Sequence, residues 1–190
     1  KYLEFQGYEI FRGSGQTDRE SLIRDIAECD AMILRTAKMD EEVLEDGKKL
    51  RIVARHGAGY DNLDVKAAKE RGIITTYSPD TTALSVAEMT ITLLLMLAKK
   101  VKRMETELRK DNFSYKFSHK GMDVSGKTLG IIGLGKIGKM VAKKAAIGLD
   151  MKVISYIPRP EGKEIPEYIK AVPLEQLLKE SDFISLHVPG

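Results

Sequence analysis

The chain has 190 residues, of which 43% are hydrophobic and 31% are charged, and its formal net charge is +3. This balance is typical of a soluble globular protein with enough apolar residues to build a core. The basic residues are spread among acidic ones, and the longest apolar run, residues 91–98, is too short to cross a bilayer, which argues against nucleic acid or a membrane as a partner.

The first half of the chain alternates candidate strands with candidate helices. Runs of apolar residues predict strands at residues 8–11, 31–34, 51–54 and 73–76. The stretches between them predict helices at residues 18–28, 40–45 and 64–71. Asp18 and Asp40 are typical helix N-caps, while Gly47 and Gly72 are typical of residues that end a helix. Residues 1–5 read as the end of a helix, so we expect the natural N-terminus to precede Lys1.

The single cysteine, Cys29, excludes an internal disulfide and fits a reducing compartment. It stands beside the apolar run at residues 31–34, so we interpret it as a buried structural thiol rather than a nucleophile. We therefore expect a cytoplasmic protein.

A long helix is predicted next, from Ala83 past Met104. Apolar residues recur in it at helical spacing and predict a stripe that packs into the core: Val86, Met89, Leu93, Met96 and Leu97. Residues 109–124 are polar and aperiodic, as in a connector.

A second alternating block follows this connector. It predicts strands at residues 129–133, 151–157 and 183–188, with helices at residues 136–146 and 174–180 between them. Strands that alternate with helices predict an α/β fold in which parallel sheets carry helices on both faces. We expect two such units, joined near residue 98.

The glycine-rich turn after the strand at 129–133 is the strongest functional signal. The pattern Gly133, Gly135, Lys136, Ile137, Gly138 follows a strand and opens an amphipathic helix, which is the context that a dinucleotide-binding turn requires. Gly133 would permit the tight turn, Gly135 would let the backbone approach a pyrophosphate, and Gly138 would let the helix pack on the strand. A glycine-rich turn without a ligand is the alternative.

Residues 121–128, Gly-Met-Asp-Val-Ser-Gly-Lys-Thr, match the P-loop pattern letter by letter. A P-loop needs a strand before it and a helix that starts at its Lys-Thr pair. Here a polar segment precedes the match and a strand follows it, so we interpret the match as coincidence.

The end of the second strand of this block bears on the choice of cofactor. A carboxylate there binds the ribose hydroxyls of NAD, but the residue after Tyr156 is Ile157, and Arg159 follows two positions later. An arginine in place of an acid would suit the 2′-phosphate of NADP, because a guanidinium matches phosphate geometry. The sequence therefore favours NADP slightly over NAD, unless Arg159 only points to solvent.

The first block carries a candidate anion site. Gly57, Ala58 and Gly59 follow a buried strand and would leave consecutive backbone amides free for a small carboxylate. Arg35 ends the neighbouring strand, where it would meet either an anionic substrate or solvent. The three histidines are far apart, so the sequence predicts no metal site.

Four stretches together resemble one family, the D-isomer-specific 2-hydroxyacid dehydrogenases, which include glyoxylate/hydroxypyruvate reductases and phosphoglycerate dehydrogenases. They are residues 56–64, 85–88, 126–135 and 181–189. The resemblance implies a flavodoxin-like substrate domain at 1–97 and the first half of a Rossmann NAD(P)-binding domain at 98–190.

The resemblance also implies roles for particular residues. The amides of Gly57–Gly59 would hold the substrate carboxylate, Thr90 would lie near the cofactor, and His187 and Pro189 would border the adenosine pocket. Relatives form homodimers, partly through the long helix and the loop after it. The family's first strand would precede Lys1.

The family's catalytic arginine, glutamate and histidine would lie beyond Gly190. We therefore name no catalytic residue in this chain and expect these 190 residues alone to be inactive. In an intact enzyme of this kind, a hydride passes from NAD(P)H to the keto carbon of a 2-oxoacid, with a histidine as the general acid.

Two alternatives of the same fold stay open. One is an NADH-binding regulatory protein similar to a transcriptional corepressor, and the other is a non-catalytic dimerisation module. The sequence leaves open which 2-hydroxyacid would be the substrate.

Overall fold

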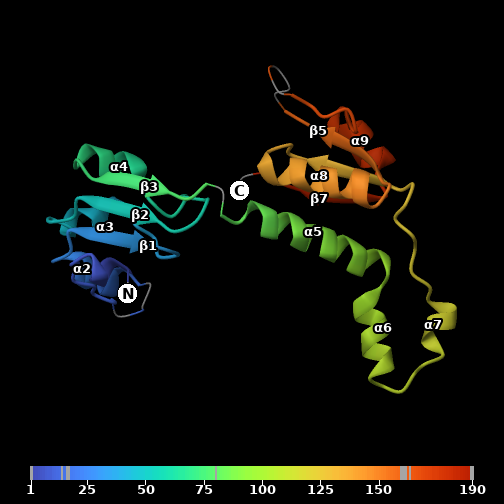
Figure 1. Ribbon diagram of the computed structural model, residues 1–190, viewed down its shortest axis with the longest axis horizontal. Helices are drawn as coiled ribbons and strands as arrows, with labels where there is room; N and C mark the ends of the chain where they lie inside the picture. The colour runs from blue at the N-terminus through green and yellow to red at the C-terminus, as the bar shows by residue number, and fades with distance from the viewer. Residues whose placement is uncertain are drawn as a thin grey trace. The chain divides into compact units, whose positions relative to one another are not determined.

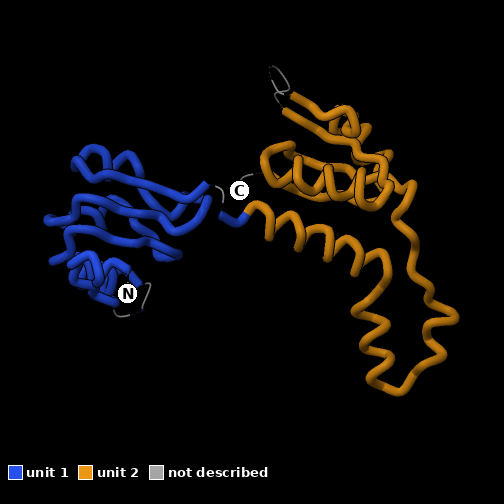
Figure 2. Tube along the Cα trace, in the orientation of Figure 1, with its two compact units in different colours: residues 1–82 blue, residues 83–190 orange. Residues whose placement is uncertain are grey.

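The computed structural model describes residues 2–13, 15, 18–79, 81–158, 162 and 164–188. The chain divides into two compact units, Lys1–Thr82 and Ala83–Gly190 (Figure 2). This division precedes the long helix, whereas the sequence places the join near residue 98. The helix belongs to the second unit because its buried face, which includes Ala87 and Leu94, shares that unit's apolar core.

The first unit contains a parallel sheet whose strands alternate with helices along the chain (Figure 1). The strands lie in the order β1 (Ala31–Leu34), β2 (Ile52–Arg55), β3 (Ile74–Tyr77). The helices are α1 (Tyr2–Phe5), α2 (Arg19–Ile26), α3 (Glu41–Asp46) and α4 (Val65–Glu70). These bounds confirm all the predicted elements of this unit except the strand at residues 8–11.

Aspartate N-caps begin three of these helices. The side chains of Asp18, Asp40 and Asp64 accept hydrogen bonds from the backbone N–H groups three residues further on. Such caps satisfy amide groups that the helix itself leaves unpaired. The first two caps confirm the sequence prediction.

The predicted strand at residues 8–11 is wrong. This segment has no regular structure, and the side chains of Tyr8 and Phe11 are 64% and 67% exposed. Alternating apolar residues favour a strand, but a strand also needs a neighbour to pair with, and none of the described strands lies beside this one.

Helices cover one face of the first sheet within the described ranges. Apolar side chains from α2, α3 and α4 form one buried cluster with Leu34 and Val53. On the opposite face, Ile33 and Ile74 are each 63% exposed. The expectation of helices on both faces is therefore met by the second unit alone.

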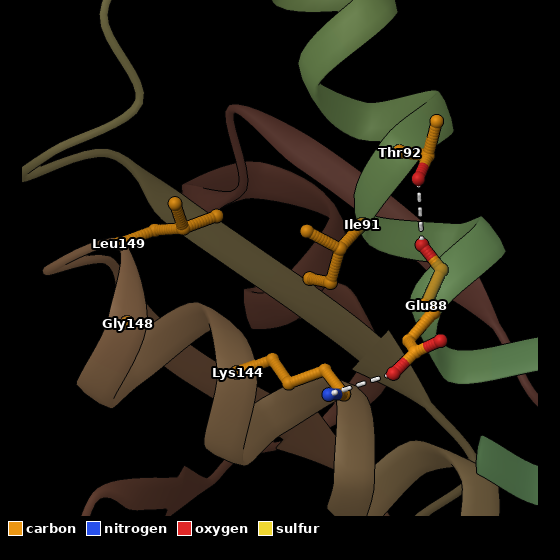
Figure 3. A pocket seen from close by; sticks show the side chains of 6 residues that line it. All are labelled: Glu88, Ile91, Thr92, Lys144, Gly148 and Leu149. Atoms are coloured by element: carbon orange, nitrogen blue, oxygen red, sulfur yellow. Dashed lines mark hydrogen bonds and ion pairs between the residues drawn. The ribbon is translucent and has the colours of Figure 1, made fainter. Parts of the chain in front are cut away.

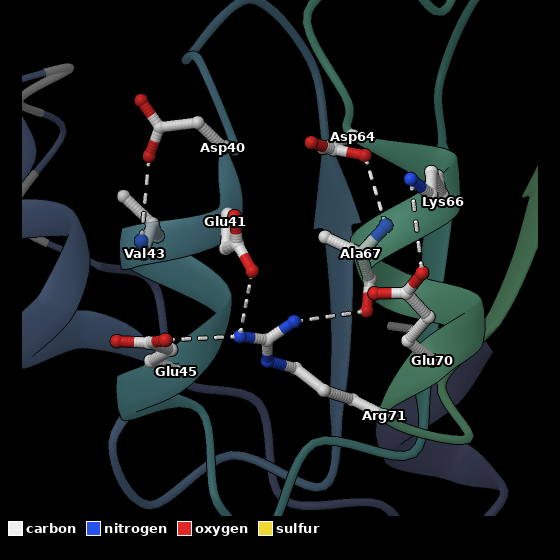
Figure 4. A network of polar contacts seen from close by, with 9 residues as sticks. All are labelled: Asp40, Glu41, Val43, Glu45, Asp64, Lys66, Ala67, Glu70 and Arg71. Atoms are coloured by element: carbon white, nitrogen blue, oxygen red, sulfur yellow. Dashed lines mark hydrogen bonds and ion pairs between the residues drawn. The ribbon is translucent and has the colours of Figure 1, made fainter.

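Arg71, at the C-terminal end of α4, connects this helix to α3 through ion pairs (Figure 4). Its guanidinium lies 3.5 Å from Glu41 and 3.1 Å from Glu45 on α3, and it also donates to the carbonyl oxygen of Ala67, 3.2 Å away. The Arg71 side chain is 26% exposed, so these contacts are partly shielded from water.

The second unit begins with the three helices α5 (Ala83–Ala98), α6 (Val101–Leu108) and α7 (Tyr115–Ser118). The predicted long helix is broken, because Lys100 adopts a left-handed conformation (φ 54°) and the returning chain caps α5 through a bond from the Met122 N–H to the Ala98 carbonyl (2.9 Å). Gly121 permits this approach, since a Cβ atom there would lie 2.7 Å from the Lys99 Cα.

The predicted core-facing stripe of the long helix is also wrong. Met89, Leu93 and Leu97 are 58%, 57% and 71% exposed, and Val86 and Met96 are exposed to 40% and 39%. The opposite face, which includes Ala87, Leu94 and Ala98, packs on α8 instead. Because α5 is apolar on all sides, periodicity could not distinguish the packed face from the uncovered one.

A parallel sheet forms the rest of the second unit. Its strands are β4 (Thr128–Ile132), β5 (Lys152–Tyr156), β6 (Ile169–Ala171) and β7 (Phe183–Leu186), with helices α8 (Lys136–Gly148) and α9 (Leu174–Glu180). Of these, β6 was not expected from the sequence. Apolar side chains of α5 and α8 cover one face, and Leu177 of α9 packs with Ile154 on the other.

The order of the strands in this sheet is β6-β5-β4-β7, and all pairs are parallel. The chain therefore builds outward on one side from β4 through β5 to β6, then crosses back to the other side of β4 with β7. Ligands of such sheets bind where the order reverses, at the carboxyl ends of the two strands that flank the reversal. Here that point lies between β4 and β7.

Within the described ranges, no helix is both long and apolar enough to span a bilayer.

Candidate functional site

Gly133 lies at the point where the strand order reverses. It follows β4 with φ at +96°, and a Cβ atom on it would lie 2.5 Å from the carbonyl oxygen of His187, just after β7. Its N–H donates to the carbonyl of Tyr156 at the end of β5 (3.3 Å). The structure thus brings Gly133, Tyr156 and His187 together, and only glycine fits at the first of these positions.

The other two glycines of the turn have different surroundings. A Cβ atom on Gly138 would lie 2.3 Å from the carbonyl oxygen of Gly133, so this glycine lets α8 start close against the strand. A Cβ atom on Gly135 would meet nothing within 4 Å. Gly135 is the N-cap of α8 and offers no side chain to its first amides, which belong to residues such as Lys136 and Ile137.

Open space beside an uncapped helix N-terminus is a site for a negatively charged group. The backbone N–H groups point toward it and the helix dipole favours the charge. The residues present therefore fit the pyrophosphate of a dinucleotide, with Gly135 leaving room for its approach.

His187 is held in a fixed position at this edge. Its backbone N–H donates to the carbonyl of Ile132 (2.8 Å), and its Nε2 lies 2.9 Å from the hydroxyl of Ser185. Burial lowers the pKa of His187 below its usual value of 6.5. The ring is therefore mainly neutral at pH 7 and adds no positive charge to the edge.

The position expected to bind the ribose hydroxyls belongs to the core. Ile157 is 7% exposed and packs in the same apolar cluster as Val153 and Leu134. Tyr156 is half-buried beside it. Arg159 and Pro189 lie outside the described residues.

Thr90 is half-buried on α5, where its hydroxyl donates to the Val86 carbonyl (2.8 Å). That bond lies within its own helix, so a position near a cofactor stays a prediction for Thr90.

The P-loop match has no P-loop structure. Thr128 begins β4, at the opposite end of the strand from Gly133. The carboxylate of Asp182 accepts from the Thr128 N–H (2.8 Å) and lies 3.8 Å from the Lys127 ammonium. Because a strand rather than a helix follows the Lys-Thr pair, the interpretation of this match as coincidence is confirmed.

The candidate carboxylate loop of the first unit lies at the carboxyl edge of its sheet. Gly57 has φ at +141°, and Gly57, Ala58 and Gly59 are half-buried or exposed. Arg35 follows β1 at the same edge and is exposed. The two segments meet, because the His56 N–H donates to the Leu34 carbonyl (2.8 Å).

Arg55 is a candidate that the sequence interpretation missed. This half-buried residue ends β2, and a Cβ atom on Gly57 would overlap its guanidinium. The guanidinium donates to the carbonyl of His56 and to Oδ1 of Asn62, and no carboxylate within the described ranges pairs with it. A basic residue that ends a buried strand just before a glycine loop was the available signal.

Cys29 is half-buried rather than buried as the sequence had suggested, but its contacts are those of a structural thiol. Its Sγ donates to the Asp25 carbonyl (3.0 Å), and burial raises the pKa of the thiol, with a further contribution from the negative charge of Asp25. A raised thiol pKa disfavours the nucleophilic thiolate.

A shallow hollow lies between α5 and α8, and no residue of the glycine turn lines it (Figure 3). Glu88 and Lys144 form an ion pair of 3.7 Å across it, and Gly148 and Leu149 line it at the far end of α8. We assign it no role in the site. In the described part of the chain, no three His, Cys, Asp or Glu side chains gather as metal ligands.

The chain is similar in sequence to known proteins over most of its length. The sequence profile of the family described as D-isomer specific 2-hydroxyacid dehydrogenase, catalytic domain, matches residues 1–182. The hydroxypyruvate reductase of Thermotoga maritima is 42% identical over 177 residues, which are 93% of this chain and 56% of that protein. The glyoxylate reductase of Korarchaeum cryptofilum is 38% identical over 186 residues, with shares of 95% and 56%. The chain thus spans little more than half the length of these relatives.

Solved structures show the same likeness. The TT0316 protein of Thermus thermophilus superposes with a TM-score of 0.87 at 33% identity, over 99% of this chain and 60% of that one. An acyclic imino acid reductase in complex with NADPH and D-Arg gives 0.84 at 27% identity, over 100% and 61%. An NAD-dependent formate dehydrogenase of Staphylococcus aureus, in complex with NAD, gives 0.84 at 26% identity, over 99% and 56%.

Proposed function

The chain belongs to the D-isomer-specific 2-hydroxyacid dehydrogenases, and from this premise we propose that the full-length protein uses NAD(P)H to reduce a small 2-oxoacid to the D-2-hydroxyacid. The observation that carries the proposal is the turn at Gly133–Gly138. At the point where the strand order reverses, Gly133 occupies a position that no other residue fits, and Gly138 lets α8 start close against the strand. The space beside Gly135, at the N-terminus of α8, is open.

When bound, the dinucleotide supplies the hydride. In our proposal the amides at the start of α8 bind its pyrophosphate, Gly133 permits the turn before them, and Tyr156, His187 and Pro189 contribute to the adenosine pocket. His187 is a binding residue only, because its neutral ring is already engaged with Ser185. The general acid and its partners are expected outside these 190 residues, so the chain by itself should not turn over.

NADP is the preferred cofactor in this proposal. Ile157 is buried and has no group that could accept hydrogen bonds from ribose hydroxyls. Arg159, two positions later, would supply the cation for a 2′-phosphate.

Two observations support the proposed substrate class, the candidate anion site and the similarity to reductases of small oxoacids. The amides of Gly57–Gly59 bind the carboxylate of the oxoacid, and Arg35 and Arg55 add positive charge at the same edge. A hydroxypyruvate reductase and a glyoxylate reductase are among the relatives, so glyoxylate and hydroxypyruvate are the substrates to test first.

A homodimer is the proposed assembly. The exposed apolar face of α5, which includes Met89, Leu93 and Leu97, would be costly to leave in water. Phe113 and Phe117, which follow α6, are also exposed, at 62% and 73%. A second copy would cover both. A cytoplasmic location stays a prediction from the sequence.

The test is steady-state oxidation of NADPH and NADH by the purified full-length protein with glyoxylate or hydroxypyruvate. We expect turnover with both acids and a higher kcat/KM with NADPH. Tight dinucleotide binding without turnover would instead favour the regulatory alternative, and failure to bind either dinucleotide would favour the dimerisation module.

A further inference from the structure

Asn62 lies where the two loops of the candidate carboxylate site meet. Its side-chain amide nitrogen donates to the carbonyl of Ala37 at 2.7 Å and lies 3.4 Å from that of Arg35, both in the loop after β1. Asn62 itself belongs to the loop after β2, which also carries Gly57–Gly59. One half-buried side chain thus joins the two segments that we assign to the substrate.

The other end of the same amide faces Arg55. Its Oδ1 accepts from the Arg55 Nε at 3.4 Å, while the guanidinium nitrogen Nη1 donates to the His56 carbonyl beside Gly57. Since an amide carries two donor hydrogens and an acceptor oxygen, asparagine can serve both contacts at once.

We infer that Asn62 is a positioning residue for substrate: it holds the loop of Arg35 against the loop of Gly57–Gly59 and orients Arg55 over them. This inference rests on the proposed function. Asn62 does not touch the substrate and acts through the groups that do.

The backbone contacts between the loops do not depend on this side chain. The Met39 N–H donates to the Asn62 carbonyl (2.7 Å), and the Asp64 N–H donates to the Met39 carbonyl (2.9 Å). Both are backbone bonds, so we expect them to persist when the side chain is replaced. The side chain adds its contacts at Arg35, Ala37 and Arg55, so its loss should disturb the site more than the fold.

Two variants of the full-length protein separate these contacts, Asn62→Ala and Asn62→Asp. Alanine removes both. Aspartate is isosteric and keeps an acceptor for Arg55, but it places a second oxygen against the Ala37 carbonyl and loses the donor. The control is Asp64→Ala in the same loop, which removes the N-cap bond to the Ala67 N–H (2.9 Å) and leaves the loop contacts intact.

For both Asn62 variants we expect kcat/KM for the 2-oxoacid to fall on the order of tenfold to a hundredfold, mainly through KM, because sub-ångström misplacement of binding groups is amplified in rate. The Kd for NADPH should stay within about twofold, since the dinucleotide site lies in the other unit. Asp64→Ala should lower the melting temperature without changing KM.

Hydrogen exchange gives a second readout that does not need turnover. Backbone amides at residues 35–38 and 56–59 should exchange faster in Asn62→Ala than in the wild type, and at the wild-type rate in Asp64→Ala. If both Asn62 variants keep the wild-type KM and exchange rates, the inference is wrong while the proposed function stands. If the wild type itself reduces no 2-oxoacid, the proposed function fails and the inference falls with it.

Discussion

Replacing Gly135 with alanine should weaken dinucleotide binding without unfolding the protein. The added methyl group would stand in the open space beside the N-terminus of α8, where it meets nothing within 4 Å. The backbone of Gly135, at φ −77° and ψ −165°, is one that alanine adopts without strain. The methyl group would therefore collide only with a bound ligand.

The expected change in stability is small. Alanine is a poorer N-cap than glycine by about 1 kcal/mol. It also restricts the unfolded chain, which stabilises the folded state by about 0.4–1 kcal/mol. The two effects largely cancel. Gly138→Ala is different, since its Cβ would lie 2.3 Å from the Gly133 carbonyl oxygen, and such overpacking costs about 1–3 kcal/mol.

The loss of binding should be large by comparison. A hydrogen bond to a charged group contributes about 1.5–3 kcal/mol, so displacing the pyrophosphate from even one amide raises Kd on the order of tenfold to a hundredfold. Fluorescence titration with NADPH measures Kd, and thermal denaturation measures stability.

Gly148→Ala is the matched control, at the other end of the same helix and also with nothing within 4 Å of the added Cβ. It should bind NADPH as the wild type does. A Gly135→Ala protein that is folded and binds NADPH with unchanged Kd would refute the placement of the pyrophosphate at this helix.

Three further predictions concern single side chains. Arg71→Ala should lower the free energy of unfolding by about 1 kcal/mol, because it removes the ion pairs between α3 and α4. Lys66→Ala removes only the exposed ion pair with Glu70 (4.0 Å) and should change this free energy by less than about 0.5 kcal/mol. Equal losses for the two variants in chemical denaturation would contradict this. Arg159→Ala should raise the Kd for NADPH about tenfold or more and leave that for NADH unchanged, and a parallel change in both titrations would show that this arginine does not select the phosphate. The folded state disfavours protonation of His187, so its contribution to stability is present above about pH 6.5 and is lost as the pH falls through the lowered pKa of the folded state. In denaturation experiments at a series of pH values, His187→Asn should therefore lose less stability over this range than the wild type. An unchanged pH profile would count against a lowered pKa for His187.

Local signals in the sequence predicted the local structure well. The caps at Asp18 and Asp40 depend on contacts within a few residues, and the structure confirms both. The glycine turn is confirmed as well, although Gly133 also meets His187 from a segment distant in the sequence. The strand order β6-β5-β4-β7 is likewise the one that the Rossmann interpretation requires. The roles proposed for the site residues, by contrast, stay predictions.

The errors arose where distant segments decide the outcome. The end of α5 depends on Met122, which returns after a long excursion to cap Ala98. The face of α5 that is buried is decided by its packing on α8. The segment at residues 8–11 forms no strand, because a strand needs a neighbouring strand to pair with. Arg55 was missed because its guanidinium lies against Gly57, a side-chain direction that sequence spacing alone does not reveal.

The most direct test of the central claim is the configuration of the product. The full-length protein would be incubated with hydroxypyruvate and NADPH, and the glycerate formed would be resolved by chiral chromatography. We predict D-glycerate alone, formed in equal amount to the NADPH oxidised. L-glycerate, a mixture of both isomers, or no product from a protein that binds NADPH would contradict it.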